Sequence, residues 1–340
     1  MAAFSKQEVT PLPELHLTDW RPTKDTLHLY CQIVGKVRLA TTSPRNHWWN
    51  APLYVDVRGL TTRRLHHNDT TFEIGFDFVD HALVVRTRDG RVRSFDLADG
   101  VPVAEFDVRL HQMLGELGVD VEINEQPFGL PIKTPFPRDR EHASWDRSAI
   151  ERYSRILDWS DGVFEEFSGW FSGKTSPVHL FWHSFDLAVT RFSGRPAPPI
   201  TADGVTREAY SQEVISFGFW AGDDNVQDAA YYSYISPEPD ELRDQPLPVG
   251  DWIAFGDGSL AILPYDVVRT ARDPRGSLLA FLQGAYEAEA RLASWDTSNF
   301  ESKWCPTVNQ LHELQATAAN DFGRPELARA LLRRSRPGSP

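Results

Sequence analysis

The sequence predicts an α+β protein made of two tandem, pseudo-symmetric halves, each a helix, an antiparallel sheet and a closing helix, sharing one core. Three observations predict this class. Alternating apolar runs are joined by Asp-Gly pairs, which favour tight hairpins between antiparallel strands. Stretches with helical periodicity precede and follow these runs. A short motif also occurs twice at one constant offset, with Ser43-Pro44, Trp49 and Arg58 matching Ser176-Pro177, Trp182 and Arg191.

A repeat with so long a period indicates a duplicated domain rather than a solenoid. We therefore expect the helix-to-strand units at 24–58 and 147–191 to superpose. In this superposition Trp49 lies on Trp182, and the alignment makes two further pairs, which are Asn50 with His183 and Leu53 with Asp186. The alternative is chance similarity between two amphipathic segments.

Composition limits the class of protein and its partners. The chain has 340 residues, of which 41% are hydrophobic, with 11 Trp and 20 Phe, so an aromatic core is expected. The net charge of −13 disfavours nucleic acid as a partner, because phosphates would be repelled. The two cysteines, Cys31 and Cys305, form no disulfide framework and suit a reducing cytoplasm. No secretory signal or membrane-spanning run is evident, so no membrane partner is expected.

The first half is predicted at 23–125, after an extended N-terminal arm at 1–22. Thr23 is a plausible N-cap for its opening helix, and Gly118 fits the end of its closing helix. Asp89-Gly90 predicts a hairpin. In order, the expected elements are a helix at 24–40, strands at 53–58, 72–78, 81–88 and 91–97, a helix at 103–117 and a short strand at 119–123.

Four prolines mark 126–146 as a linker, because proline stiffens a connection and blocks helix formation. The second half is predicted at 147–303, with Asp146 as the cap of its long first helix. Residues 304–340 are expected to add a helical extension. In order, the expected elements are a helix at 147–171, strands at 179–192, 211–220, 229–235, 252–255 and 259–263, and a helix at 277–293.

Several strings in this pattern resemble an uncharacterised bacterial family, a DUF5996-like domain of unknown function with a cyanobacterial prototype. The strings are Asn46-His47-Trp48-Trp49, Arg58-Gly59-Leu60-Thr61-Thr62, Arg140-Glu141-His142-Ala143-Ser144 and the run from Ser184 to Pro199. The resemblance covers about residues 10 to 300. It implies no activity, because none is assigned to the family, and it transfers no catalytic residue.

Titratable groups that occur in only one half mark a candidate site, because packing alone would need the same residues in both. We predict a polar cavity between the halves in which His183 is an acid or base, Asp186 orients it and Glu213 adds a carboxylate. Arginines suit an anionic ligand group, and tryptophans would form the walls. The predicted ligand-binding residues are His47, Trp49, His179, Trp182, Arg191 and Arg195. The competing interpretation pairs Asp186 with Arg191 or Arg195 near the surface and leaves His183 merely exposed.

No metal site is predicted. His179 and His183 stand four residues apart in a predicted strand, which separates them by about 13 Å of backbone. No Cys/His framework, Walker loop, dinucleotide-binding glycine motif or nucleophile elbow is present, so no cofactor is expected. Lys36 and Lys174 each follow a glycine, which suggests helix ends.

Two functions of different class are compatible with these features. The first is an enzyme or small-molecule binder with its site between the halves, which makes a small-molecule ligand the expected partner. The second is a non-catalytic interaction or structural protein that uses its duplicated surface. An extensive apolar patch outside any cleft would favour the second. The sequence specifies neither the reaction nor the oligomeric state.

Overall fold

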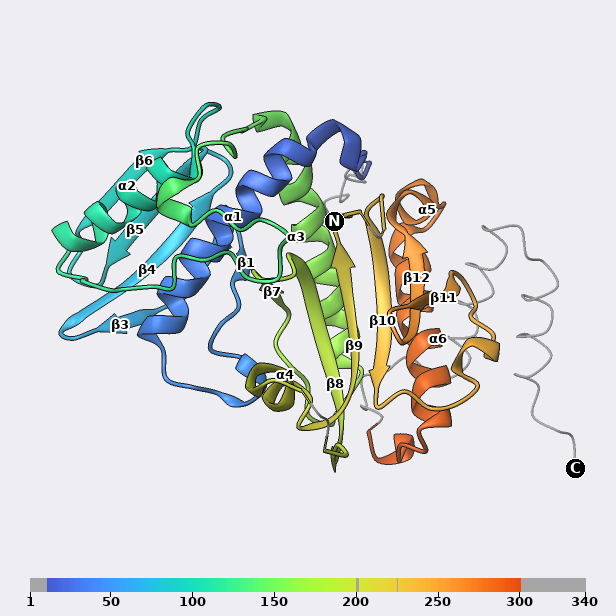
Figure 1. Ribbon diagram of the computed structural model, residues 1–340. Coiled ribbons are helices and arrows are strands. Elements are labelled where there is room, and N and C mark those ends of the chain that lie inside the picture. The colour runs from blue at the N-terminus through green and yellow to red at the C-terminus, as the bar shows by residue number, and fades with distance from the viewer. Residues whose placement is uncertain (1–10, 200–201, 225, 301–340) are drawn as a thin grey trace, which may run out of the picture.

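The computed structural model describes residues 11–199, 202–224 and 226–300, and it confirms the α+β class. Two antiparallel sheets of six strands each lie side by side, with α1 and α3 between them (Figure 1). Buried apolar residues from both sheets and their helices belong to one hydrophobic cluster. Among the described residues, no helix is both long enough and apolar enough to cross a membrane.

The first sheet has the strand order β1-β2-β4-β5-β6, with β3 paired to β4. Helices α1 and α2 pack on one of its faces, where Phe106 of α2 stacks against Tyr30 of α1 and Phe76 of β4. The elements are α1 (Leu17–Thr41), η1 (Asn46–Trp48), β1 (Tyr54–Asp56), β2 (Gly59–Thr61), β3 (Leu65–His67), β4 (Thr70–Asp77), β5 (Ala82–Thr87), β6 (Val92–Asp96), α2 (Val103–Glu116) and η2 (Phe136–Arg138).

The second sheet has the order β7-β8-β9-β10-β12-β11 and packs against α3 and α6. As predicted, Asp146 caps α3, because its carboxylate accepts hydrogen bonds from the amides of Ser148 and Ala149. The elements are α3 (Arg147–Gly169), β7 (His179–Phe181), β8 (Asp186–Pro196), α4 (Gly204–Ala209), β9 (Gln212–Trp220), β10 (Ala230–Ser236), η3 (Leu242–Asp244), β11 (Asp251–Phe255), β12 (Gly258–Pro264), α5 (Tyr265–Thr270), α6 (Pro274–Leu292) and η4 (Thr297–Asn299).

The central strands of the two sheets correspond row by row. In the first sheet, the last residue of β4 pairs with the first residue of β2 on one side and with the first residue of β5 on the other. In the second sheet, the last residue of β9 pairs in the same way with the first residues of β8 and β10. The matching rows are Gly59–Asp77–Ala82 with Asp186–Trp220–Ala230, and Thr61–Gly75–Val84 with Ala188–Gly218–Tyr232. We call such positions ladder-equivalent. The shared order agrees with a duplicated architecture, although the duplication itself stays a prediction.

These rows do not follow the single offset that the sequence motif suggested. Trp49 precedes β1, whereas Trp182 follows β7, so the two tryptophans are not equivalent. Gly59, rather than Leu53, is ladder-equivalent to Asp186. Leu53 instead forms a reciprocal pair of backbone hydrogen bonds with Leu180, of 2.9 and 2.8 Å. This bridge joins the edges of the two sheets.

Trp182 packs between the two halves and contacts both, so we call it the wedge. Its indole lies against Gly35 of α1, where a Cβ atom would come within 2.1 Å of Trp182 Cδ1. The indole Nε1 donates to the carbonyl oxygen of Ala51 at 3.0 Å. The Gly35-Lys36 pair therefore lies inside α1 and not at a helix end, which corrects the prediction. Lys36 Nζ donates to the carbonyl of Asn124, and so holds the start of the proline-rich segment on α1.

Three further boundaries differ from the prediction. Helix α1 begins at Leu17, so Thr23 is an interior residue whose hydroxyl contacts Ser144 and accepts from the amide of Asp146. The strands predicted at 53–58 and 179–192 are each interrupted by a turn, giving the β1–β2 and β7–β8 hairpins. Residues 119–123 form no strand. The predicted extension at 304–340 and Cys305 lie outside the described residues.

Candidate functional site

Hydroxyl and carboxyl side chains gather on the face of the second sheet that turns away from α3 and α6. The helices cover the other face, where Arg191 Nη2 donates to the carbonyl of Phe167 and Ser160 contacts the hydroxyl of Tyr231. Side chains alternate along a strand, so the even-numbered residues of β8, β9 and β10 share the opposite face. We call this group the tyrosine face, and it comprises Asp186, Thr190, Ser216, Gly218, Tyr232 and Tyr234.

The carboxylate of Asp186 is held by two hydroxyl groups. Ser184 Oγ donates to Oδ1, and the hydroxyl of Tyr232 donates to Oδ2. Tyr232 stands on β10 and crosses the whole of β9 to reach Asp186 on β8. It can do so because the intervening residue is Gly218, where a Cβ atom would lie 2.4 Å from Tyr232 Cζ. Gly218 is therefore a requirement of the Asp186–Tyr232 contact.

Two further hydroxyl pairs continue this network along the sheet. The hydroxyls of Tyr210 and Tyr234 lie 2.9 Å apart, and those of Thr190 and Ser216 lie 2.7 Å apart. The rings of Tyr232 and Tyr234 stack with centroids 6.1 Å apart. Burial raises the pKa of Tyr232 well above its usual value, and the charge of Asp186 adds to the shift. Tyr232 is thus a neutral hydrogen-bond donor at physiological pH.

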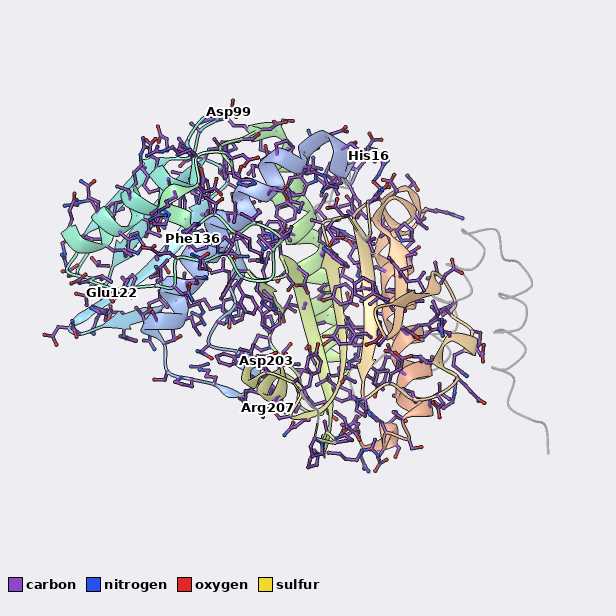
Figure 2. The ribbon with its side chains drawn as sticks, viewed as in Figure 1. His16, Asp99, Glu122, Phe136, Asp203 and Arg207 are labelled. Atoms are coloured by element: carbon purple, nitrogen blue, oxygen red, sulfur yellow. The ribbon has the colours of Figure 1, made fainter. Side chains whose placement is uncertain are left out.

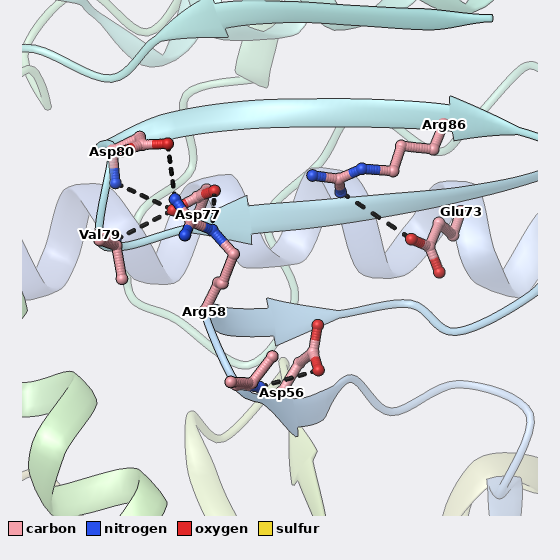
Figure 3. Close-up of polar contacts among 8 residues, drawn as sticks. Asp56, Arg58, Glu73, Asp77, Val79, Asp80 and Arg86 are labelled. Atoms are coloured by element: carbon pink, nitrogen blue, oxygen red, sulfur yellow. Dashed lines mark hydrogen bonds and ion pairs between the residues drawn. The ribbon is translucent and has the colours of Figure 1, made fainter. Parts of the chain in front are cut away.

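The corresponding face of the first sheet has a different character. Glu73 and Arg86 are ladder-equivalent to Ser216 and Tyr234. They form an ion pair of 3.9 Å whose side chains are 43% and 46% exposed. Nearby, Arg58 bridges Asp77 and Asp80 (Figure 3). The Glu73–Arg86 part of this face is solvated, as one face of an antiparallel sheet can be, whereas Ser216, the ladder equivalent of Glu73, is only 6% exposed.

His183 lies in the turn between β7 and β8, next to Asp186. Its ring contacts those of Phe181 and Phe128, with centroids 5.2 and 6.0 Å away. Burial lowers the pKa of His183, and the charge of Asp186 opposes that effect. The oxygens of Asp186 are bonded to Ser184 and Tyr232 rather than to His183. The structure thus brings the two predicted residues close together without the predicted orienting hydrogen bond.

Glu213 and Arg195 do not join this group. Glu213 has the opposite parity on β9 and lies near its other end, where it accepts hydrogen bonds from Ser193 and from Arg195 Nε at 2.7 Å. Arg195 also donates to the carbonyls of Ala293 and Ser294 after α6. The single cavity predicted to contain these residues with His183 is therefore not the arrangement found. Asp186 also forms neither of the ion pairs that the competing interpretation proposed.

Three other predicted ligand-binding residues are fully or almost fully buried. Arg191 is 1% exposed and lies over the ring of Phe167 at 3.6 Å. Trp182 is the wedge between the halves. His179 is 0% exposed, and neither of its ring nitrogens has a hydrogen-bond partner among the described residues. Burial, and then the nearby charges of Arg63 and Arg38, lower the pKa of His179 to about 3.

The predicted residues His47 and Trp49 form a second group with Lys174, which the sequence had suggested only as a helix-end residue. Lys174 Nζ donates to His47 Nε2 at 2.8 Å and to Gln212 Oε1 at 2.9 Å. Its charge lies 4.4 Å from the ring centroid of Phe192 and 5.4 Å from that of Trp49. We call these five residues the lysine site. Burial lowers the pKa of Lys174, and the charge of Glu208 opposes that effect.

Contacts with α4 hold His47 and Trp48 in a strained backbone conformation. His47 and Trp48 both have left-handed backbone angles, with φ of 55° and 59°, which cost about 1–3 kcal/mol each for residues other than glycine. The amide of His47 donates to Glu208 Oε1 at 3.2 Å, and Trp48 Nε1 donates to the carbonyl of Val205. Asp203 and Arg207, labelled in Figure 2, mark the position of α4 beside this segment.

The tyrosine face and the lysine site are continuous. Phe192 follows Thr190 on the same face of β8, and Gln212 has the same parity as Ser216 on β9. The sequence could not reveal the contact between His47 and Lys174, because 127 residues separate them. Among the described residues, no group of three His, Cys, Asp or Glu side chains is placed to hold a metal ion.

Comparison with known proteins adds the family and nothing finer. No curated protein and no solved structure matches the chain. The model of one family, described as a family of unknown function, matches residues 12–302, which include both sheets, the tyrosine face and the lysine site. By that match over most of its length, the chain belongs to the DUF5996 family.

Proposed function

We propose that the protein is an enzyme or binder of a small polar organic molecule that lies on the tyrosine face. One observation carries the proposal, namely the difference between ladder-equivalent positions of the two sheets. Solvation explains the exposed Glu73–Arg86 pair on the first sheet. Solvation does not explain a carboxylate, three tyrosines and two hydroxyl side chains joined by hydrogen bonds on the second.

The chemistry of the face indicates the kind of ligand. Hydroxyl groups both donate and accept hydrogen bonds, so they suit a ligand with several oxygen atoms. The stacked rings of Tyr232 and Tyr234 offer a flat apolar surface beside these groups. The lysine site adds one positive charge at the end of the face. A compact organic molecule with hydroxyl, carbonyl or carboxylate groups meets all three features.

The network also has a structural explanation, in which it only fastens the segment around Tyr210 to the sheet. Ligand binding separates the two explanations. Compounds of the stated class are screened by their effect on thermal unfolding, and hits are measured by calorimetry on wild type, Tyr234→Phe and Asp186→Asn. The matched control is Arg86→Ala, which changes the ladder-equivalent position of Tyr234 on the first sheet.

We expect Tyr234→Phe to weaken a true ligand by roughly fivefold to tenfold, the equivalent of one lost hydrogen bond of about 1–1.5 kcal/mol. Arg86→Ala should leave the affinity unchanged. A ligand whose affinity is the same in all variants binds elsewhere, and this outcome would remove the tyrosine face as the site.

A further inference from the structure

Lys174 has surroundings that a structural lysine does not require. Among the described residues, no carboxylate oxygen lies within 4.0 Å of its Nζ, although the protein is strongly acidic. Its two hydrogen-bond acceptors, His47 Nε2 and Gln212 Oε1, are neutral groups. Surface lysines usually gain an ion pair or full hydration. Lys174 has no ion pair with a described residue, since Glu208 influences its pKa only from beyond 4.0 Å, and its side chain is half-buried beside two aromatic rings.

The hydrogen bonds of His47 determine its tautomer. Its Nδ1 lies 3.0 Å from the carbonyl oxygen of Ala209, and a carbonyl can only accept. Nδ1 therefore carries the proton, and Nε2 presents a lone pair to Lys174. Burial lowers the pKa of His47, and the charge of Lys174 contributes, so the neutral imidazole is favoured. An unprotonated nitrogen thus lies 2.8 Å from the lysine ammonium.

We propose that Lys174 is a reactive amine that forms an imine with the carbonyl group of a small aldehyde or ketone, with His47 as its proton carrier. The assignment rests on the function proposed above, because the carbonyl compound would lie at the lysine end of the tyrosine face. It names a substrate class and a catalytic pair for that face.

The step balances with the groups present. The ammonium of Lys174 gives a proton to His47 Nε2, and the freed amine lone pair forms a bond to the carbonyl carbon. The C=O π pair moves to oxygen, which takes the second amine proton and gives a carbinolamine. The imidazolium then returns its proton to the hydroxyl group, which leaves as water while the C=N bond forms. No oxidant, metal or further reactant is needed.

Competitive acetylation tests the amine directly. Intact protein is treated with trace acetic anhydride across a pH series, and mass spectrometry follows each lysine. Lys133 is exposed and serves as the internal reference. Lys36 is the second reference, because burial lowers its pKa to about 8 while the side chain remains only 8% exposed and bonded to backbone carbonyls. We expect Lys174 to react at a lower pH than Lys133 and faster than Lys36.

Gln212→Glu is the decisive variant. It preserves the shape of the side chain and puts a carboxylate where an amide oxygen lies 2.9 Å from Nζ. An adjacent opposite charge shifts a pKa by about 1–3 units, so acetylation of Lys174 near neutral pH should slow at least about tenfold. Gln112→Glu, an exposed position on α2, adds the same charge at a distance and should leave Lys174 unchanged.

Reductive trapping tests the substrate class. Propanal with cyanoborohydride should alkylate Lys174 ahead of Lys133 in wild type and in Gln112→Glu, and should do so more slowly in Gln212→Glu. Equal or slower reaction of Lys174 relative to Lys133 in both assays overturns the inference. If ligands still depend on Tyr234 in that case, the proposed function survives alone. A reactive Lys174 without any Tyr234-dependent ligand overturns the placement of the carbonyl compound on the tyrosine face.

Discussion

Replacing Gly35 by alanine tests the wedge that joins the two halves. Helix propensity alone predicts stabilisation, because alanine is favoured over glycine inside a helix by roughly 1 kcal/mol. The structure predicts the opposite sign. The new Cβ atom would lie 2.1 Å from Trp182 Cδ1 and 2.4 Å from its Cγ, which are atoms of a rigid ring rather than the end of a flexible chain.

The magnitude follows from two losses. Overpacking in a dense core costs about 1–3 kcal/mol. Moving the indole also strains or breaks its hydrogen bond to the Ala51 carbonyl, worth roughly 1 kcal/mol. Subtracting the propensity gain leaves Gly35→Ala less stable than wild type by roughly 1–3 kcal/mol. Gly162→Ala in α3 is the matched control, because nothing lies within 4 Å of its new Cβ atom.

Urea unfolding at neutral pH measures both free energies of unfolding. Gly162→Ala should gain about 0.5–1 kcal/mol, so the two alanine variants should differ by roughly 1.5–4 kcal/mol. In a Trp182→Ala background the clash is absent, and adding Gly35→Ala should then stabilise. A Gly35→Ala protein as stable as Gly162→Ala would show that Trp182 does not press on α1, and the account of the junction would fail.

Three further predictions concern buried groups. Gly218→Ala should displace Tyr232 from Asp186 and destabilise the protein by about 1–3 kcal/mol. The ladder-equivalent Gly75→Ala should not, because the nearest neighbour of its new Cβ atom lies at 3.7 Å. Urea unfolding of the two variants makes the comparison. Burial lowers the pKa of His179 from 6.5 to about 3, so its contribution to stability is present above pH 6.5 and is lost as the pH falls toward 3. His179→Leu should therefore reduce the slope of the free energy of unfolding against pH in this range by up to about 1.4 kcal/mol per pH unit. An unchanged slope would contradict this. Burial raises the pKa of Glu289 well above 4.5, so the stability of wild type should decline as the pH rises above 4.5. In thermal unfolding, the stability of Glu289→Gln relative to wild type should therefore be higher at pH 8 than at pH 4. The same difference at both pH values would refute a buried neutral acid.

Elements with local signals were predictable from the sequence. Asp146 caps α3 where expected, and Asp89-Gly90 lies in the β5–β6 turn. The second Asp-Gly pair lies at the β11–β12 hairpin, where Asp257 is in the turn and Gly258 begins β12. The turn at 182–185 has no such signal, since it contains neither glycine nor proline. Its left-handed residue is Phe185, with φ of 60°, which stacks on His28. Tertiary packing fixes this turn, so the sequence indicated one long strand instead.

The candidate site was predictable only in part, for a related reason. The sequence marks Asp186 as a residue that packing does not explain and predicts His183 as its partner, whereas the structure pairs it with Tyr232, which reaches it only because Gly218 has no side chain. The sequence predicts His47 and Trp49 as ligand-binding residues, but no local pattern links them to Lys174. A contact across two strands, or across 127 residues, depends on sheet register and leaves no trace in local sequence pattern.

Whether ladder-equivalent positions of the two sheets agree depends on the face on which they lie. On the helix-covered faces, several equivalent positions keep apolar or aromatic character, as Leu60 with Leu187 and Phe76 with Phe219 show. Ser233, which is equivalent to Val85, is an exception, and its hydroxyl donates to Glu289 of α6. Packing against helices demands this in both sheets. On the opposite faces the pairs diverge, with Gly59 replaced by Asp186, Glu73 by Ser216 and Arg86 by Tyr234. The fold imposes no such change, because the first sheet forms the same ladder without it. A requirement that acts on the second face alone, such as the ligand binding proposed above, would explain why buried polar side chains occupy this face of the second sheet.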